Sequence, residues 1–213
     1  MKTFYKILSI TMLLYSCMEK KSNSQSHEKN EQYSPTPDTT SYMNLKPLLE
    51  ETSMLMLERK EFELSSGQIE SKWVGNKPAT DSEIQEAENR LKLKLPGDYK
   101  AFLKLTNGFP ASSSVEPTFA PVSEINYLKK LDPELIEIWH ENGTSDIALD
   151  LERSILIAGL HEEQLFLIIP PETDGQKWTY WKFASWIPGE HEYNNLIFYF
   201  EKVNKFLKET HKN

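Results

Sequence analysis

The chain has 213 residues, of which 38% are hydrophobic and 26% are charged. This composition is typical of a folded protein with a hydrophobic core, and it excludes a chain that is disordered throughout. The formal net charge of -8 argues against nucleic acid as a partner, because phosphate binding depends on lysine and arginine. An acidic surface favours either a basic protein partner or simple solubility, and the composition leaves both open.

The N-terminus has the pattern of an export signal. Two lysines precede a mostly apolar run from Ile7 to Tyr15, which is shorter than the roughly 20 residues that span a bilayer. The run ends in Leu14-Tyr15-Ser16-Cys17, which resembles the bacterial lipobox, although Tyr15 is bulkier than usual there. We expect residues 1–16 to be a lipoprotein signal peptide and Cys17 to be lipidated. The alternatives are an ordinary secretory signal with a chance cysteine, or a short membrane anchor.

The next segment, residues 17–44, is almost entirely polar. Such a stretch cannot bury enough apolar surface to offset the entropy of ordering it, so we expect a flexible tether. Pro35 and Pro37 would stiffen part of it. A lipid on Cys17 would then place the rest of the chain in the cell envelope, outside the cytoplasm, on the periplasmic side or at the cell surface.

Helical patterns fill the first half of the remaining chain. Residues 45–66 have apolar side chains at helical spacing, and Gly67 is expected to end that helix. A loop follows, and Thr80 and Glu83 then fit a capping box that starts a second helix. Its core face is predicted to contain Ile84, Ala87 and Leu91.

Two further helices are expected before the spacing of apolar residues changes from helical to strand-like. One begins at Pro96-Gly97-Asp98, with Asp98 as the N-cap or Pro96 in the first turn, and ends at Asn107-Gly108. The other runs from about Ser123 to His140, with a break at Pro133.

The second half favours strands. Residues 154–159 and 164–169 are short and apolar, which predicts a hairpin around His161-Glu162-Glu163. Residues 178–183 form a third, aromatic strand, and an amphipathic helix is expected over residues 195–208. Helices followed by a meander and a final helix predict the α+β class, with helices packed on a small, mostly antiparallel sheet.

Several of these segments together resemble one family, the SUKH superfamily of Smi/Knr-type domains. The matching segments are Trp73-Val-Gly-Asn-Lys-Pro-Ala-Thr-Asp-Ser-Glu-Ile84, Ala87-Glu88, Leu91, Leu95-Pro96-Gly-Asp-Tyr99-Lys100-Ala-Phe102-Leu103 and Asn107-Gly108. The resemblance covers residues 45–209 and leaves residues 210–213 as a tail. It is carried by the ordered set of segments, because no single motif among them is specific.

The resemblance implies a binding domain without catalytic residues. Bacterial members of the family are typically immunity proteins that neutralise toxins of contact-dependent or polymorphic systems, and fungal relatives are scaffolds. We therefore expect a protein partner, for which a basic toxin domain is one candidate. Such immunity proteins generally act in the cytosol, whereas a lipoprotein signal would place this chain outside it. An envelope scaffold or housekeeping binding module without a toxin therefore stays as the alternative.

The sequence contains no pattern of an enzyme site. His161-Glu162-Glu163 lacks the second histidine of a zinc-protease motif, and Cys17 would be consumed by lipid. His140-Glu141 and Glu190-His191-Glu192 would contribute to a metal site only if folding brought them together. We expect no catalysis, no cofactor and no metal.

Acidic and aromatic residues around the predicted strands are the candidates for partner binding. They are Glu162, Glu163, Asp174, Trp178, Tyr180 and Glu190. Alternation along residues 178–183 sends one aromatic face into the core and leaves the other as an exposed platform of the kind that anchors interfaces. The competing interpretation is that the last helix covers that platform and that the acids are ordinary solvated loop residues.

Overall fold

The computed structural model describes residues 39–141, 145–173, 176–184 and 187–210. Within these residues it has eight helices and five strands. The helices are α1 (Thr39–Arg59), α2 (Ser66–Ser71), α3 (Asp81–Leu91), α4 (Gly97–Leu105), α5 (Leu128–Leu131), α6 (Pro133–Glu141), α7 (Ser145–Arg153) and α8 (Leu196–Thr210). The strands are β1 (Asn126–Tyr127), β2 (Ile155–Ala158), β3 (Gln164–Ile169), β4 (Thr179–Ala184) and β5 (Ile187–Tyr193).

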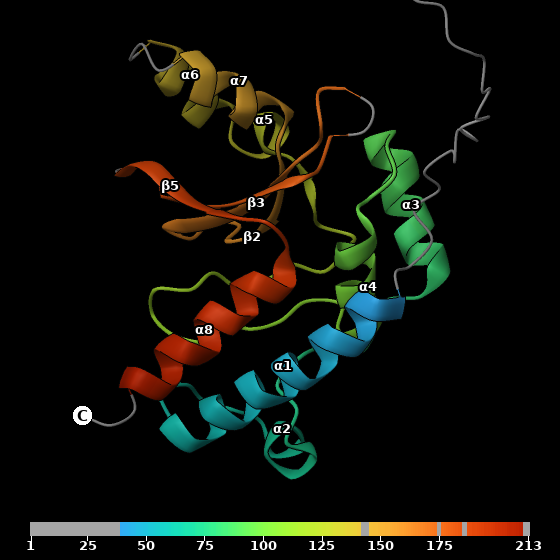
Figure 1. Cartoon of the computed structure of the whole chain (residues 1–213), viewed down its shortest axis with the longest axis vertical. Coiled ribbons are helices and arrows are strands. Elements are labelled where there is room, and N and C mark those ends of the chain that lie inside the picture. The colour runs from blue at the N-terminus through green and yellow to red at the C-terminus, as the bar shows by residue number, and fades with distance from the viewer. Residues whose placement is uncertain (1–38, 142–144, 174–175, 185–186, 211–213) are drawn as a thin grey trace, which may run out of the picture. The chain divides into compact units, whose positions relative to one another are not determined.

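The strands form one sheet in chain order, and each is antiparallel to the next. Short connections join β2 to β3 and β4 to β5, as in a meander. Helices α5, α6 and α7 lie on one side of this sheet, and α1, α4 and α8 lie on the other (Figure 1). The predicted α+β class is therefore confirmed, including the antiparallel sheet.

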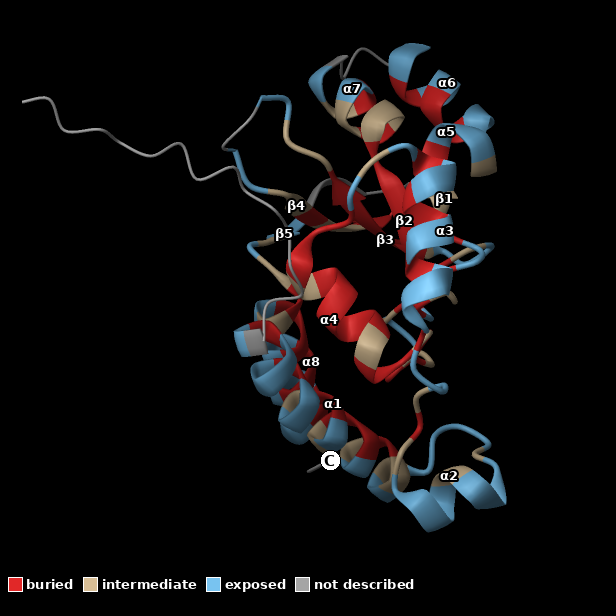
Figure 2. Cartoon of the chain, turned by 90° about the vertical axis from the view of Figure 1, so that its right-hand side faces the viewer, coloured by how far each residue is buried: buried red, intermediate tan, exposed pale blue. Residues whose placement is uncertain are grey.

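The sheet separates two hydrophobic cores, because successive residues of a strand point to opposite faces. In β3, Phe166 and Ile168 enter one core, while Leu165 and Leu167 enter the other. We call the first the large core; its largest fully buried side chains include Leu45, Leu49, Met56, Leu91, Tyr99, Phe102, Phe109, Phe166, Tyr180, Tyr199 and Phe200. The small core consists of Leu128, Leu135, Ile136, Trp139, Ala148, Leu151, Leu156, Leu165, Leu167 and Phe183. Figure 2 shows the resulting burial of strands β2 and β3 and of α4, with exposed outer sides on α1, α3 and α8.

The first helix differs from its prediction at both ends. It begins at Thr39, within the predicted tether, and ends at Arg59 rather than near residue 66. Lys60 adopts a left-handed conformation, with φ of 53°, and donates its N–H to the Met56 carbonyl, which stops the helix. Gly67 does not end this helix. It lies in α2, which Ser65 and Gln68 start with a capping box of their own.

The predicted start of α3 is confirmed. The Thr80 hydroxyl accepts a hydrogen bond from the Glu83 N–H (3.2 Å), and the Glu83 carboxylate accepts one from the Thr80 N–H (2.7 Å). The same arrangement lowers the pKa of Glu83, because the hydrogen bonds from Thr80 favour the charged carboxylate. Lys92 then ends the helix in the left-handed region.

The predicted caps of α4 are wrong. Pro96 is the N-cap, and Asp98 lies inside the helix, where its carboxylate accepts hydrogen bonds from the Tyr180 hydroxyl and the Leu196 N–H. At the other end the chain leaves the helix through an extended Thr106 instead of Asn107-Gly108. The side chains of Asp98 and Asn107 thus make tertiary contacts instead of capping the helix. Asn107 accepts a hydrogen bond from the Val122 N–H (2.7 Å) and so holds the following loop.

The region between residues 123 and 153 contains elements that the sequence pattern did not reveal. The break at Pro133 is confirmed, since α5 ends at Leu131 and α6 begins at Pro133. The expected helix start, however, is the two-residue strand β1, and α7 was not predicted. Strand β5 was also missed, whereas the β2–β3 hairpin, β4 and α8 match their predicted places within one or two residues.

None of the described helices is both long enough and apolar enough to cross a membrane. Residues 1–38 lie outside the described residues, and they include the predicted signal peptide, Cys17 and most of the tether. The tail at 211–213 lies outside them as well.

Candidate partner-binding surface

Two of the predicted binding residues, Glu162 and Glu163, lie exposed in the turn of the β2–β3 hairpin. Gly159 and His161 turn the chain with φ angles of 84° and 66°. The Glu162 N–H donates to the Gly159 carbonyl (2.9 Å), and the Glu162 carboxylate accepts from the Thr118 N–H (3.0 Å). These bonds hold the acidic turn in a defined conformation.

The N-terminus of α6 brings two more acids to the same place. The Asp132 carboxylate accepts a hydrogen bond from the Leu135 N–H (3.0 Å) and so caps the helix. Glu134 lies in the first turn, where the positive end of the helix dipole favours a negative charge. Helix stability alone can therefore explain Asp132 and Glu134, but it does not explain their meeting with Glu162 and Glu163.

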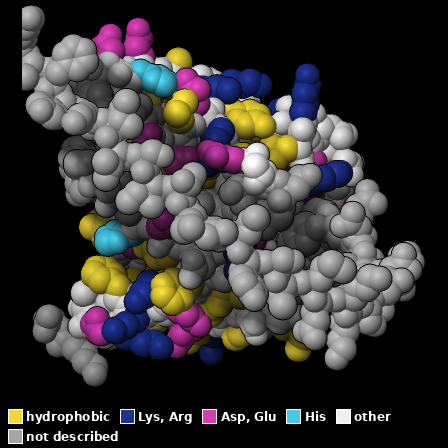
Figure 3. Space-filling model, turned by 45° about the horizontal axis from the view of Figure 1, so that its top comes forward, with side chains coloured by type: hydrophobic (Ala, Val, Ile, Leu, Met, Phe, Trp, Pro, Cys, Tyr) yellow, Lys and Arg dark blue, Asp and Glu magenta, His cyan; other side chains and the backbone are white. Residues whose placement is uncertain are grey.

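The turn and the helix together enclose a surface hollow of about 340 Å³. We call it the acidic hollow, and it is lined by Asp132, Glu134, Leu135, Ile138, Glu162, Glu163 and Leu165. Its apolar wall continues the small core outward, because Leu135 and Leu165 are nearly buried while Ile138 is 46% exposed. Figure 3 turns the end that carries α5–α7 forward and shows acidic and hydrophobic side chains next to one another on that face.

The charge of the acidic hollow is not balanced by ion pairs within the described residues. Over the described ranges, none of its four carboxylates forms an ion pair with a lysine, arginine or histidine. The only charged residues in its lining are these four acids. Four like charges at one exposed hollow repel each other, and a cation arriving from outside would relieve that repulsion.

On β4 the structure supports the competing interpretation, in which the aromatic residues pack against the cores on both sides of the sheet. Tyr180 is only 1% exposed in the large core, and its hydroxyl donates to the Asp98 carboxylate. Trp178 is half-buried against the same core, while Trp181 and Phe183 pack into the small core. Tyr180 thus has no surface from which to contact a partner.

The remaining candidates cannot be placed. Asp174 and Cys17 lie outside the described residues, and so does the side chain of Glu190, whose backbone belongs to β5.

A half-buried polar cluster lies on the side of the sheet that faces the large core, and sequence reasoning missed it. The Glu116 carboxylate accepts hydrogen bonds from the Lys182 ammonium (2.8 Å) and the Tyr199 hydroxyl (2.7 Å). Burial and the charge of Glu116 raise the pKa of Tyr193 to about 12 and that of Tyr199 well above its usual value. Since these groups are bonded to one another, the cluster fastens the loop after α4 to β4 and α8.

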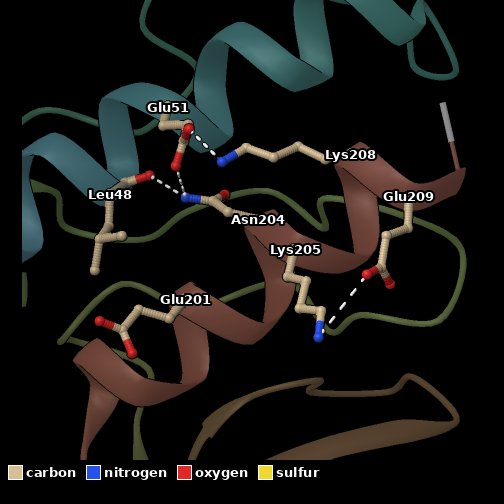
Figure 4. A pocket seen from close by; sticks show the side chains of 7 residues that line it. All are labelled: Leu48, Glu51, Glu201, Asn204, Lys205, Lys208 and Glu209. Atoms are coloured by element: carbon tan, nitrogen blue, oxygen red, sulfur yellow. Dashed lines mark hydrogen bonds and ion pairs between the residues drawn. The ribbon is translucent and has the colours of Figure 1, made fainter. Parts of the chain in front are cut away.

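A second surface hollow, of about 350 Å³, lies between α1 and α8 (Figure 4). Unlike the acidic hollow, it contains matched charges: Glu51 pairs with Lys208 (2.6 Å) and Lys205 with Glu209 (3.9 Å). Asn204 is buried beneath them and donates to the Leu48 carbonyl (3.0 Å) and the Glu51 carboxylate (3.0 Å). This hollow is therefore the seam that holds the two helices together.

The structure also separates the histidines. His140 of α6 lies 2.7 Å from the Glu152 carboxylate of α7, and His191 is exposed on β5. Within the part of the chain that the structure describes, no group of three or more His, Cys, Asp or Glu side chains is arranged to hold a metal ion.

Comparison with known proteins identifies the family of this chain. A search of curated proteins finds no match. A family model matches residues 78–209, from the loop before the Thr80 capping box to the end of α8, and its description is the SMI1/KNR4 family (SUKH-1). The match covers more than half of the chain and includes every residue of the acidic hollow. The chain therefore belongs to the SMI1/KNR4 (SUKH-1) family.

Proposed function

We propose that this protein is a non-catalytic binding protein of the immunity type, which neutralises a toxin of a contact-dependent or polymorphic system. The observation that carries the proposal is the acidic hollow, an exposed concave surface whose carboxylates have no basic partner within the described residues. The family is consistent with immunity-type proteins, and the net charge of -8 suits a basic toxin domain.

The polar groups of the family-like segments support binding rather than catalysis. Glu88 is buried and bonded to the Leu95 N–H (3.1 Å) and the Lys94 ammonium (2.6 Å), so it holds the turn between α3 and α4. Asp98 joins α4 to β4 and α8, and Glu116 joins a loop to the sheet. Each of these side chains already has a packing or fastening role, which leaves the exposed surface as the place for function.

The lipoprotein signal adds a location to the proposal. With a lipid on Cys17, the domain would be held at a membrane outside the cytoplasm. The toxin would then be met in the periplasm or at the surface rather than in the cytosol.

Crosslinking in intact envelopes tests the proposal. The full-length protein is crosslinked in its own envelope, the captured protein is identified, and its toxic domain is directed to the periplasm of a sensitive strain. We expect the wild-type protein to restore growth and the Cys17→Ser variant, which cannot be lipidated, to protect less. A captured partner without toxicity, or toxicity that the wild-type protein does not relieve, would reject the immunity role.

A second candidate is an envelope scaffold without a toxin, and the lipoprotein signal is the observation that favours it. It predicts that the crosslinked partner is a resident envelope protein. Deleting the gene should then alter the envelope in cells that meet no competitor. The immunity role predicts a phenotype only when the toxin is present.

A further inference from the structure

The acidic hollow has two chemically different parts whose positions relative to each other restrict what fits it. Leu135, Ile138 and Leu165 form the apolar wall, and the carboxylates of Glu134, Glu162 and Glu163 stand around it. An ion that needs a closed shell of oxygen ligands gains nothing from the apolar wall, and the described residues form no cluster suited to a metal. A purely apolar segment would cover the carboxylates without offering them a partner, which costs free energy.

A side chain with an alkyl stem and a cationic head matches both parts. Lysine and arginine lay their methylene groups along apolar surface and keep the charged head in a polar rim. We propose that the acidic hollow is the docking site for a lysine or arginine that projects from an apolar patch of the protein partner. The stem would cover Ile138, which is 46% exposed, and the head would lie among the glutamates.

The local structure makes this site ready before binding. Asp132 caps α6 and Glu162 is held by the Thr118 N–H, so the two walls of the hollow are fixed by hydrogen bonds rather than by a ligand. A preformed site loses little entropy on binding, and its negative field would speed the encounter with a basic surface. Neighbouring apolar residues of the partner would meet Ile138 and complete the contact.

This inference rests on the proposed function, because it names the face and the partner chemistry of the same binding activity. It adds that the contact needs both parts of the hollow, and that distinguishes it from a general attraction between an acidic protein and a basic one. A matched set of variants separates these possibilities. The acids of the hollow to be changed are Glu134, Glu162 and Glu163. The control acids are also exposed: Glu58 lies in α1, Glu63 before α2 and Glu70 in α2.

The direct test uses the full-length protein in a nonionic detergent, with its isoleucine methyl groups labelled for NMR. The probe is the capped tripeptide Lys-Leu-Lys, and Lys-Ser-Lys and Glu-Leu-Glu serve as comparison peptides. We expect Lys-Leu-Lys to shift the Ile138 methyl signal. Affinity should fall about tenfold in the triple variant E134Q/E162Q/E163Q, since the peptide has two lysines and two exposed charge pairs of about 0.7 kcal/mol each correspond to that factor. The control triple variant E58Q/E63Q/E70Q, with the same change in net charge, should bind as the wild type does.

Several outcomes would overturn the proposal. Equal weakening in both triple variants would mean that only net charge matters, and equal binding of Lys-Ser-Lys would remove the apolar wall from the contact. An unshifted Ile138 signal, or the same shift with magnesium chloride at equal concentration, would also reject it.

The growth assay keeps this proposal separate from the immunity role. If E134Q/E162Q/E163Q protects against the captured toxin as well as the wild type does, the docking site is wrong and immunity stands. If Lys-Leu-Lys binds as expected but the protein relieves no toxicity, the docking site stands and immunity is wrong.

Discussion

The two cores on opposite sides of the sheet differ in how they are closed. The large core is covered by the long helices α1 and α8, and its rings contact each other in a continuous group. Phe119 lies 5.0 Å from Phe102, 5.5 Å from Phe166 and 5.7 Å from Phe200, measured between ring centroids. The small core is covered by the three short helices α5–α7, and there Trp139 and Phe183 contact each other with ring centroids 5.5 Å apart.

This difference assigns stability mainly to the large core and binding mainly to the side of the small core. The large core buries its aromatic side chains almost completely, so it supplies most of the hydrophobic stabilisation. The small core places apolar and acidic side chains at the surface, where the acidic hollow lies. Changes in the large core should therefore act on the stability of the whole domain, and changes in the small core should act on local order and binding.

The largest effect is expected at Gly159, in the turn between β2 and β3. Its φ is 84°, and a Cβ there would lie 1.9 Å from the backbone carbonyl oxygen of Gln164, which cannot move without breaking the hairpin. Gly159→Ala should prevent stable folding, seen as loss of the cooperative thermal transition. Gly67→Ala is the control, because its Cβ would meet nothing within 4 Å, and α2 should tolerate or gain from alanine. A folded G159A protein with a near-normal melting temperature would contradict the close approach.

Phe102→Ala and Phe183→Ala test the division between the cores directly. Both side chains are fully buried, Phe102 in the large core and Phe183 in the small core against Trp139 (5.5 Å). Truncating a buried phenylalanine costs about 3–5 kcal/mol. We expect F102A to lower the free energy of unfolding of the whole domain by that amount. F183A should instead release α5–α7 by local unfolding.

Hydrogen exchange followed residue by residue distinguishes the two responses. In F183A the amides of α5–α7 should exchange faster while those of α1 and α8 keep their protection. In F102A protection should fall in all of these helices together. If F183A lowers protection equally on both sides of the sheet, the two cores form one cooperative unit and the comparison fails.

The sequence revealed the parts of this arrangement that depend on neighbouring residues. The Thr80–Glu83 capping box, the Pro133 break and the β2–β3 hairpin are local patterns, and each was correctly predicted. Helix α7 was missed, and strand β5 was missed because the segment that becomes it contains proline and glycine. Strand β1 is only two residues long and gains its conformation from pairing with β2.

Only part of the candidate site could be predicted, because the rest depends on contacts between residues distant in the sequence. Glu162 and Glu163 were selected because they lie in a predicted turn, but their approach to Asp132 and Glu134 joins segments about 30 residues apart. Tyr180 was misassigned because alternation gives the two faces of a strand without telling how many of them are covered. Asp98 was expected to cap a helix, and tertiary contacts with β4 and α8 used its carboxylate instead.

A smaller effect is expected from Glu88, the buried acid at the edge of the large core. Its carboxylate accepts from the Leu95 N–H (3.1 Å) and lies 2.6 Å and 3.4 Å from the Lys94 and Lys100 ammonium groups. Glutamine keeps the acceptor for the N–H but removes the charge that the lysines contact. Glu88→Gln should lower the free energy of unfolding by about 2 kcal/mol in urea titrations. Glu86→Gln, exposed on the same helix, should change it by less than about 0.5 kcal/mol.

Alkaline pH should weaken the large core through its tyrosines. The pKa of Tyr193 is raised from 10.0 to about 12 by burial and by the charge of Glu116. A folded-state pKa above the unfolded value means that this contribution to stability is fully present below pH 10 and is lost as the pH rises through about 12. Urea midpoints measured from pH 8 to 11.5 should therefore fall above pH 10. Tyr193→Phe should make that fall shallower, and an unchanged slope would show that Tyr193 does not contribute.

The smallest effect concerns Tyr99, whose ring is central to the large core while its hydroxyl has no hydrogen-bond partner among the described residues. Burial without a partner raises the pKa of this hydroxyl, and it also means that the hydroxyl has lost its hydrogen bond to water on folding. Tyr99→Phe keeps the stacking with Phe102 (6.0 Å between centroids) and removes that cost. We expect stability to stay equal or rise by up to about 1 kcal/mol, measured by urea unfolding. Tyr180→Phe should instead lower it, because that hydroxyl is bonded to Asp98. If both changes destabilise equally, a polar contact supports Tyr99 as well, and the large core depends on more than its rings.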